Sequence, residues 1–218
     1  MTYSCTEEQA LKSLAGHEMR IIRDDGVHRH IRFRRPETSN QWFDLITWHG
    51  TLCIDGDMGT YVFRRIEDMF EFFRTDREYA LRKGNKLAIN PGYWSEKLQA
   101  DSVFGKGHKT FSPERFREHV KEAFDDWRES NEPDAEDAEA LWEEIEGEVL
   151  CYENDGETRA IDSALAFDSD TAPDFNFDDA WEWRCQEYTY HFIWCCYAIA
   201  WGIQLYDETK TAEQKEAA

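Results

Sequence analysis

The sequence lacks every short motif that would identify a common enzyme. It contains no GxSxG, no GxxxxGK[ST], no HExxH, and no GxGxxG following a predicted strand. Its six cysteines form no CxxC pair, which disfavours zinc fingers and dithiol redox sites and is typical of small buried side chains in a reducing compartment. We therefore expect no catalytic residues, no resident metal and no cofactor, and the sequence favours a protein without enzymatic activity.

Features of an exported or membrane protein are also missing. The N-terminal MTYSCTEEQ has no basic residue and no apolar stretch, so no signal peptide is expected. The longest apolar stretch, residues 188–206, contains a histidine and a glutamine and has acidic flanks, which favours a buried helix over a membrane span. We expect a cytoplasmic protein with no membrane partner.

Basic residues are scarce in the second half of the chain. Residues 1–110 carry 17 Lys and Arg against 16 Asp and Glu, whereas residues 111–218 carry 8 against 30. The net charge of −21 therefore comes from the second half. Such a field repels nucleic acid and attracts basic surfaces, so it argues against direct binding to nucleic acid.

One segment concentrates this acidity. Residues 132–148 contain nine acids and no base, and the wider window 129–182 contains 20 acids with Arg159 as its single base. On a helix, 17 residues span ~25 Å, or one charge per ~2.8 Å. Duplex DNA carries one charge per ~1.7 Å counting both strands and ~3.4 Å per strand.

Two interpretations of this density are open. It is typical of a phosphate-mimicking surface that occupies the cationic groove of a nucleic-acid-binding protein, and equally of an ordinary solvated helix face. On the first interpretation, five glutamates are the expected contacts with the partner: Glu136, Glu139, Glu143, Glu146 and Glu153.

Residues 19–65 have the pattern of an antiparallel sheet. Apolar and polar residues alternate with a period of two, as in VHRHIRFR at 27–34, and DDG, PETSN and GDMG supply turns. The pattern predicts a meander of four or five strands over 19–65. A short helix is expected before it, over residues 6–18, with Thr6 as its N-cap.

Residues 66–206 are expected to be mainly helical and acidic. Ser112-Pro113-Glu114 is typical of a helix start, and apolar residues then recur at helical spacing through 127 and again from 141 to 149. We predict a helix over 157–167, a loop over 168–179, and a last helix over about 179–206 followed by a frayed tail. The order of these elements predicts an α+β fold, with an N-terminal antiparallel β-meander packed with a helical C-terminal half. Because no Pro/Gly/Ser-rich linker separates the halves, we expect a single integrated domain over 1–218.

Two alternatives involve the strand-rich part. His28 and His30 share a strand face, and Asp55 and Asp57 lie on a later segment, so a divalent metal site and a metal-dependent nuclease or phosphodiesterase are conceivable. The arginines at 20, 23, 29, 32, 34 and 35 suit phosphate contacts. Pairing of these arginines with acids of the same chain, in one protomer or in a homodimer, is the favoured interpretation.

The block HIRFRRPETSNQWFDLITWHGTLCIDGDMGTYVFRRIEDMFEFF (30–73), with INPGYWSEKLQA (89–100), resembles a group of uncharacterised proteins encoded by tailed phages and prophages of Gram-negative bacteria. The resemblance covers about residues 17–130 and implies a bacterial host cytoplasm, with no residue role. In charge, the chain is similar to acidic anti-CRISPR and anti-restriction proteins. We therefore expect a phage-encoded, non-enzymatic inhibitor of a host CRISPR or restriction complex, which acts as a DNA mimic through protein-protein interaction with a basic nucleic-acid-binding partner. A phage structural or assembly adaptor is the remaining alternative.

Overall fold

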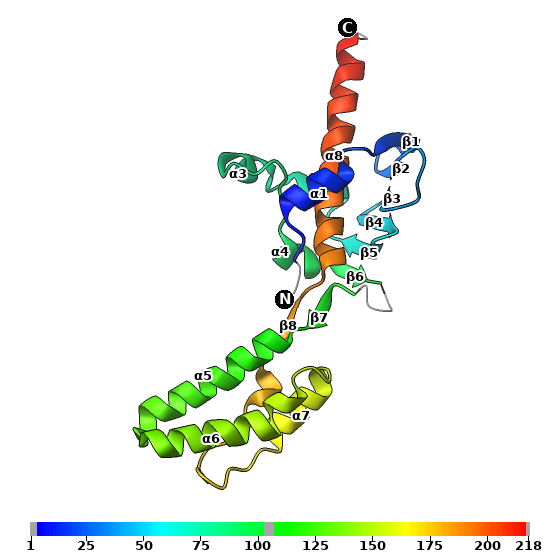
Figure 1. The fold of residues 1–218 in the computed structure, drawn as a ribbon. Coiled ribbons are helices and arrows are strands. Elements are labelled where there is room, and N and C mark those ends of the chain that lie inside the picture. Colours follow the sequence, from blue (N-terminus) through cyan, green and yellow to red (C-terminus); the bar gives the residue numbers. More distant parts are fainter. Residues whose placement is uncertain (1–3, 103–106, 217–218) are drawn as a thin grey trace. The chain divides into compact units, whose positions relative to one another are not determined.

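A computed structural model describes residues 4–102 and 107–216. Its fold is α+β, as predicted, with an antiparallel sheet in the first half of the chain and mainly helices in the second (Figure 1). The chain divides into two compact units. Within the described residues, the sheet unit takes the segments before residue 110 and after residue 187, and the helical unit takes residues 110–187. The helical unit is thus inserted into the sequence of the sheet unit. The expectation of one integrated domain over 1–218 stays a prediction.

The predicted meander is confirmed and gains a sixth strand. All neighbouring strands pair antiparallel, in the order β1-β2-β3-β4-β5-β6. The strands are β1 (Glu18–Asp25), β2 (His28–Arg34), β3 (Phe43–Trp48), β4 (Thr51–Gly56), β5 (Gly59–Arg64) and β6 (Leu98–Ala100). Because side chains alternate between the two faces of a strand, the apolar residues of β2 to β5 gather on one face. Fully buried there are Ile31, Phe33, Phe43, Leu45, Leu52, Ile54, Tyr61 and Phe63.

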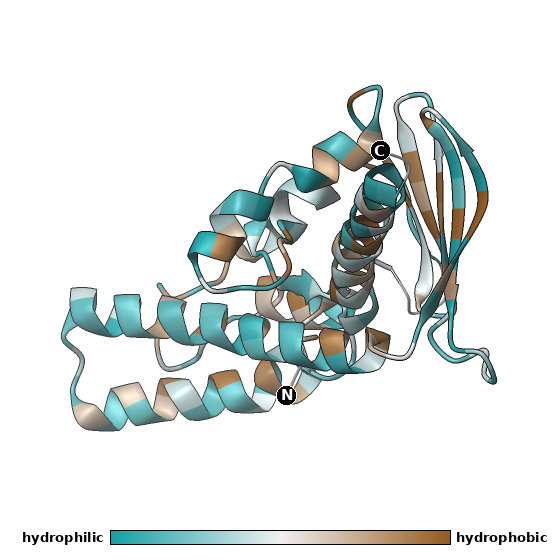
Figure 2. Ribbon diagram, turned by 90° about the horizontal axis from the view of Figure 1, so that it is seen from above, coloured by the Kyte–Doolittle hydropathy of each residue, from teal (hydrophilic) through white to brown (hydrophobic). Residues whose placement is uncertain are grey.

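Helix α8 (Tyr190–Glu216) covers this apolar face (Figure 2). Gly202 permits the close approach, since a Cβ at that position would lie 3.0 Å from both Phe33 Cζ and Leu45 Cδ1. The shorter helices of the sheet unit are α1 (Glu7–Leu14), α2 (Met69–Arg74), α3 (Arg77–Arg82) and α4 (Pro91–Ser95). Helix α1 starts at the predicted cap, where the Thr6 hydroxyl accepts from the Gln9 amide.

The bounds predicted for the last helix are wrong at both ends. Residues 180–182 form a 3-10 turn and 186–188 form strand β8 (Gln186–Tyr188), so α8 begins only at Tyr190. The Thr189 hydroxyl accepts from the Phe192 amide, and the Thr189 amide donates to the His108 carbonyl, which fixes this start. The tail remains helical to Glu216 because Asp207 pairs with Arg74 and Lys210 pairs with Asp24.

None of the described helices, α8 included, is long and apolar enough to cross a membrane.

The helical unit is built around its own core. Its elements are β7 (Lys109–Phe111), α5 (Pro113–Asn131), α6 (Ala135–Glu148), η1 (Leu150–Tyr152), α7 (Glu157–Leu165), η2 (Ala180–Glu182) and β8, with β7 and β8 paired at the two points where the chain crosses between units. Helices α5 and α6 lie side by side as an antiparallel hairpin (Figures 1 and 2), joined by a tight turn in which Glu132 has a positive φ of 46°. The loop predicted over 168–179 is confirmed, and its Phe175 and Phe177 are buried in this core.

Two glycines give a matched test of these packing arguments. A Cβ at Gly56 would lie 2.2 Å from the Trp42 carbonyl oxygen and 2.8 Å from Phe43 Cα, both backbone atoms, whereas nothing lies within 4 Å of a Cβ at Gly147 in α6. We expect Gly56→Ala to destabilise the fold by about 1–3 kcal/mol through overpacking. Gly147→Ala should stabilise it by about 0.5–1 kcal/mol through helix propensity. Urea denaturation midpoints measure both, and shifts of the same sign would contradict this account.

Candidate functional site

Four of the five predicted contact glutamates share one exposed face of α6. Glu136, Glu139, Glu143 and Glu146 follow one another at steps of three, four and three residues, and at about 100° per residue they fall within a sector of about 80°. All four are exposed. The opposite face of the helix carries the buried residues Leu141, Ile145 and Val149. The apolar spacing that buries one side of α6 therefore turns these carboxylates to solvent.

These carboxylates have no close counter-charge. Among the described residues, no ion pair within 4.0 Å joins any of the four to a basic side chain; the electrostatic neighbour of Glu146 is Arg117 on α5. The contrast with α5 is direct, because α5 has four basic residues and its Asp125 pairs with both Lys121 and Arg128. Helix α6 has seven acids and no base.

The spacing along this face is wider than the sequence density suggested. Glu136 and Glu146 are ten residues apart, or ~15 Å along the helix axis, so the four charges are spaced by ~5 Å. One DNA strand carries a phosphate per ~3.4 Å. The figure of one charge per ~2.8 Å counted acids on every side of the helix. The face alone is therefore a sparser polyanion than a nucleic-acid strand.

Other acids of the segment stabilise the unit itself. Asp134 caps α6 by accepting from the amides of Glu136 and Asp137 at 3.1 and 3.0 Å. Glu144 accepts hydrogen bonds from the Ser169 and Thr171 hydroxyls and, at 3.1 Å, from the Thr171 amide. The bonds from Ser169 and Thr171 lower the pKa of Glu144. Neighbouring glutamates of one helix thus have different roles, because Glu144 is hydrogen-bonded to Ser169 and Thr171, whereas Glu143 is exposed.

Glu153 lies outside the α6 face. It follows η1, only 18 % of its side chain is exposed, and it accepts a 2.8 Å hydrogen bond from Arg117 Nε. The bond raises the pKa of Arg117 and largely satisfies the carboxylate. A role for Glu153 as a partner contact stays a prediction.

A second acidic feature of the helical unit lies between α5 and the loop before η2. It is a cavity of about 260 Å³ in which the ring of Trp183 stacks on His119, with centroids 5.5 Å apart. The acids that line it are Glu122, Asp126, Asp178 and Asp179. This cavity could not be predicted from local sequence patterns, because its acids come from segments more than 50 residues apart.

The structure does not bring the four residues of the metal alternative together at one site. His30 Nε2 lies 2.8 Å from the Asp44 carboxylate, Asp55 accepts from the Thr60 hydroxyl, and Asp57 accepts from the Gln41 amide. His28 is exposed at the end of β2. The described residues hold no group of three or more His, Cys, Asp or Glu side chains suited to a metal ion.

Three of the six arginines of the basic strip pair with acids of the same chain, and these are Arg23, Arg29 and Arg32. Arg29 donates to both oxygens of Asp68, at 2.9 and 2.8 Å. Arg32 donates to both oxygens of Asp44, at 2.8 Å each. Burial raises the pKa of Asp44, but the hydrogen bonds from Arg32 and His30 outweigh it, so the pKa lies below its usual value. Half of the basic strip thus agrees with the favoured interpretation, whereas no ion pair within 4.0 Å joins Arg20, Arg34 or Arg35 to an acid among the described residues.

The thiols do not form a reactive site. Four of the six cysteines are buried, Cys53 is half-buried and Cys151 is exposed. Burial raises the pKa of Cys53 and of Cys185 to about 11, which leaves both thiols protonated near neutral pH.

No family model matches the chain, and neither the curated proteins nor the solved structures include a significant match.

Glu143 and Glu144 are neighbours on α6 and provide a test of the different roles assigned to its glutamates. Glu144→Ala removes three hydrogen bonds to a carboxylate, so we expect a loss of about 1–3 kcal/mol of stability. Hydrogen exchange at the Thr171 amide should accelerate as well. Glu143→Ala is the matched control and should leave both quantities unchanged. Equal effects of the two variants would contradict the assignment.

Proposed function

We propose that this chain is a non-enzymatic binding protein whose helical unit occupies a cationic, nucleic-acid-binding surface of a host protein. The observation that carries the proposal is the face of Glu136, Glu139, Glu143 and Glu146, which is exposed and has no ion-pair partner within 4.0 Å among the described residues. Exposed carboxylates without counter-charges are attracted to basic clefts and repel nucleic acid itself.

The charge distribution between the units supports this proposal. The helical unit carries 26 acidic and 6 basic side chains, whereas the remainder of the chain carries 20 and 19. The excess charge is thus a property of the helical unit. Uniform acidity for solubility would not require such segregation.

The packing of the helical hairpin also supports it. Helices α5 and α6 share one hydrophobic core, in which the tilted rings of Phe124 and Trp142 lie 5.0 Å apart between centroids. Carboxylates fixed on a rigid helix lose less entropy on binding than the same charges on a flexible tail. In the acidic cavity beside α5, Trp183 offers an aromatic surface, so the cavity has the chemistry to accept a Lys or Arg side chain of the partner.

The resemblance to proteins of tailed phages and prophages suggests the class of partner. We propose a CRISPR or restriction complex of a Gram-negative host, which this chain would inhibit as a DNA mimic in the host cytoplasm. The charge density along the α6 face is below that of a DNA strand. The mimicry would therefore depend on several acidic surfaces of the helical unit together.

The test is capture from a host lysate with the full chain as bait, followed by affinity measurements on the captured nucleic-acid-binding protein. Changing Glu139, Glu143 and Glu146 to Lys should weaken binding at least about tenfold, because like charges then face each other. Affinity of the wild-type chain should fall steeply with salt, and DNA should compete for the partner.

A control with the same change in net charge separates a local from a general effect. Glu37, Glu71 and Glu78 are exposed residues of the sheet unit, and their replacement by Lys should leave binding nearly unchanged. Affinity that does not depend on salt, or equal losses in the two triple variants, would overturn the proposal.

A further inference from the structure

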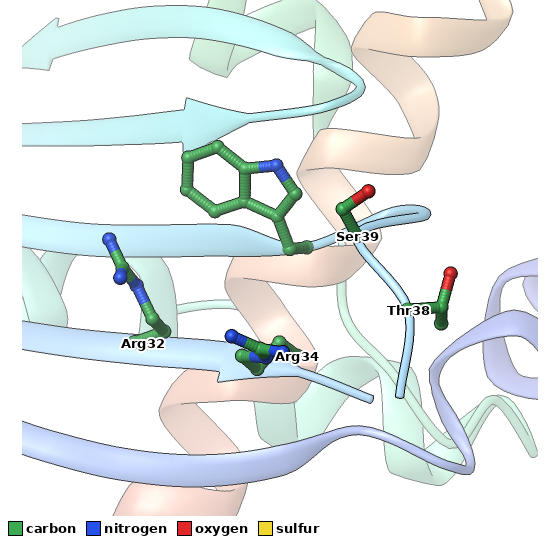
Figure 3. A pocket seen from close by; sticks show the side chains of 5 residues that line it. Arg32, Arg34, Thr38 and Ser39 are labelled. Carbon is green, nitrogen blue, oxygen red and sulfur yellow. The ribbon is translucent and has the colours of Figure 1, made fainter. Parts of the chain in front are cut away.

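The outer face of the sheet carries a small basic pocket at the β2–β3 connection (Figure 3). Its volume is about 210 Å³, and its lining residues are Arg32, Arg34, Thr38, Ser39 and Trp42. We propose that this pocket binds a phosphate group, either free or carried on a mononucleotide. The proposal concerns the sheet unit and is independent of the acidic face.

A buried carboxylate fixes the first guanidinium. Asp44, whose side chain is only 5 % exposed, accepts from Arg32 Nε and Nη2 at 2.8 Å each. The guanidinium has five N–H donors, so three remain after this pairing. Trp42 packs against the same group, with its ring centroid 5.4 Å from Arg32 Cζ. Arg32 is therefore held in place with donors to spare, which is the arrangement that a preorganised anion site requires.

The second guanidinium has no carboxylate partner within 4.0 Å among the described residues. Arg34 is exposed and donates only to backbone carbonyls, those of Arg35 at 3.4 Å and Pro36 at 3.2 Å. Glu18 is its register partner on β1, but no ion pair within 4.0 Å joins the two among the described residues. Figure 3 shows Arg32 and Arg34 on β2, with Thr38 and Ser39 on the segment that follows.

One cross-strand neighbour adds positive charge, whereas the partner of Arg34 is the acidic Glu18. Arg20 on β1 lies directly opposite Arg32 in the register of the sheet. Like charges at opposite positions of an antiparallel pair destabilise the sheet. A bound anion would offset that repulsion as well as the charge of Arg34.

The loop that carries the remaining groups is held by specific contacts. Gln41 has a φ of 57°, in the left-handed region that is uncommon for a residue other than glycine. Its amide donates to Asp57 at 2.8 Å, and its carbonyl lies 2.8 Å from His17 Nε2. The Trp42 carbonyl accepts from the Asp57 amide at 3.0 Å. Backbone strain held by such contacts is typical of binding sites.

The donor groups and the volume of the pocket indicate the class of its ligand. Two guanidinium groups and two hydroxyls line the pocket, and no carboxylate does. Four donor groups from two segments suit a tetrahedral ion with several oxygens better than a carboxylate with two. A volume of about 210 Å³ is below the usual range of drug-sized sites, ~300–1,000 Å³, so it suits a phosphate with at most a small attached group inside the pocket.

The experiment is a titration of the full chain with inorganic phosphate and with AMP, followed by calorimetry and by ³¹P line broadening. We expect millimolar or tighter binding. Arg34→Gln should weaken it about tenfold or more, since a charge-assisted hydrogen bond is lost. Arg34 is exposed and outside the Asp44 pair, so this variant should fold, which circular dichroism checks.

Arg23→Gln is the matched control. It removes an exposed arginine of the same sheet that pairs with Asp25 at 3.1 Å and does not line the pocket, so phosphate affinity should not change. If AMP binds more tightly than phosphate and Trp42→Leu removes this difference, the ligand is a nucleotide. If the two bind equally, the ligand is the free phosphate ion. Absence of binding by the folded chain, or equal affinity of Arg34→Gln and the wild type, would overturn the proposal.

Discussion

The sheet unit depends on one constraint, which is that an apolar helix must cover one face of the sheet. Trp201 of α8 lies edge-on to Phe33 and Phe43 at 5.7 and 6.5 Å between centroids. At the edge of this interface, Arg29 is held by Asp68, and the Tyr206 hydroxyl donates to Asp24. Because α8 occupies this face, the alternation of β2 directs His30, Arg32 and Arg34 to the other one. The same packing that completes the core thus exposes the basic groups.

The two units differ in net charge. The helical unit carries 20 more acidic than basic side chains, whereas the rest of the chain is within one charge of neutrality. The acidic face and the basic pocket thus belong to different units, each with its own hydrophobic core.

Local patterns were sufficient to predict most of the fold. The meander, the cap at Thr6 and the helices around Phe116 and Leu141 all follow from periodicity within a few residues. Strands β6 and β8, of three residues each, have no such pattern and exist only through their partners. The same limit applies to the sites. Helical spacing was enough to place Glu136 to Glu146 on one face, but the pairing of Glu153 with Arg117 joins residues 36 positions apart.

The insertion of the helical unit has a consequence for biosynthesis. Strands β1 to β5 leave the ribosome about 150 residues before the end of α8, a delay on the order of 8–30 s at ~5–20 residues per second. During that interval their apolar face lacks α8, while residues 110–187 are completed and able to collapse on their own core. The helical unit of the nascent chain can therefore fold before the sheet unit is complete. A chaperone that shields exposed strands would act on the first third of the translation product.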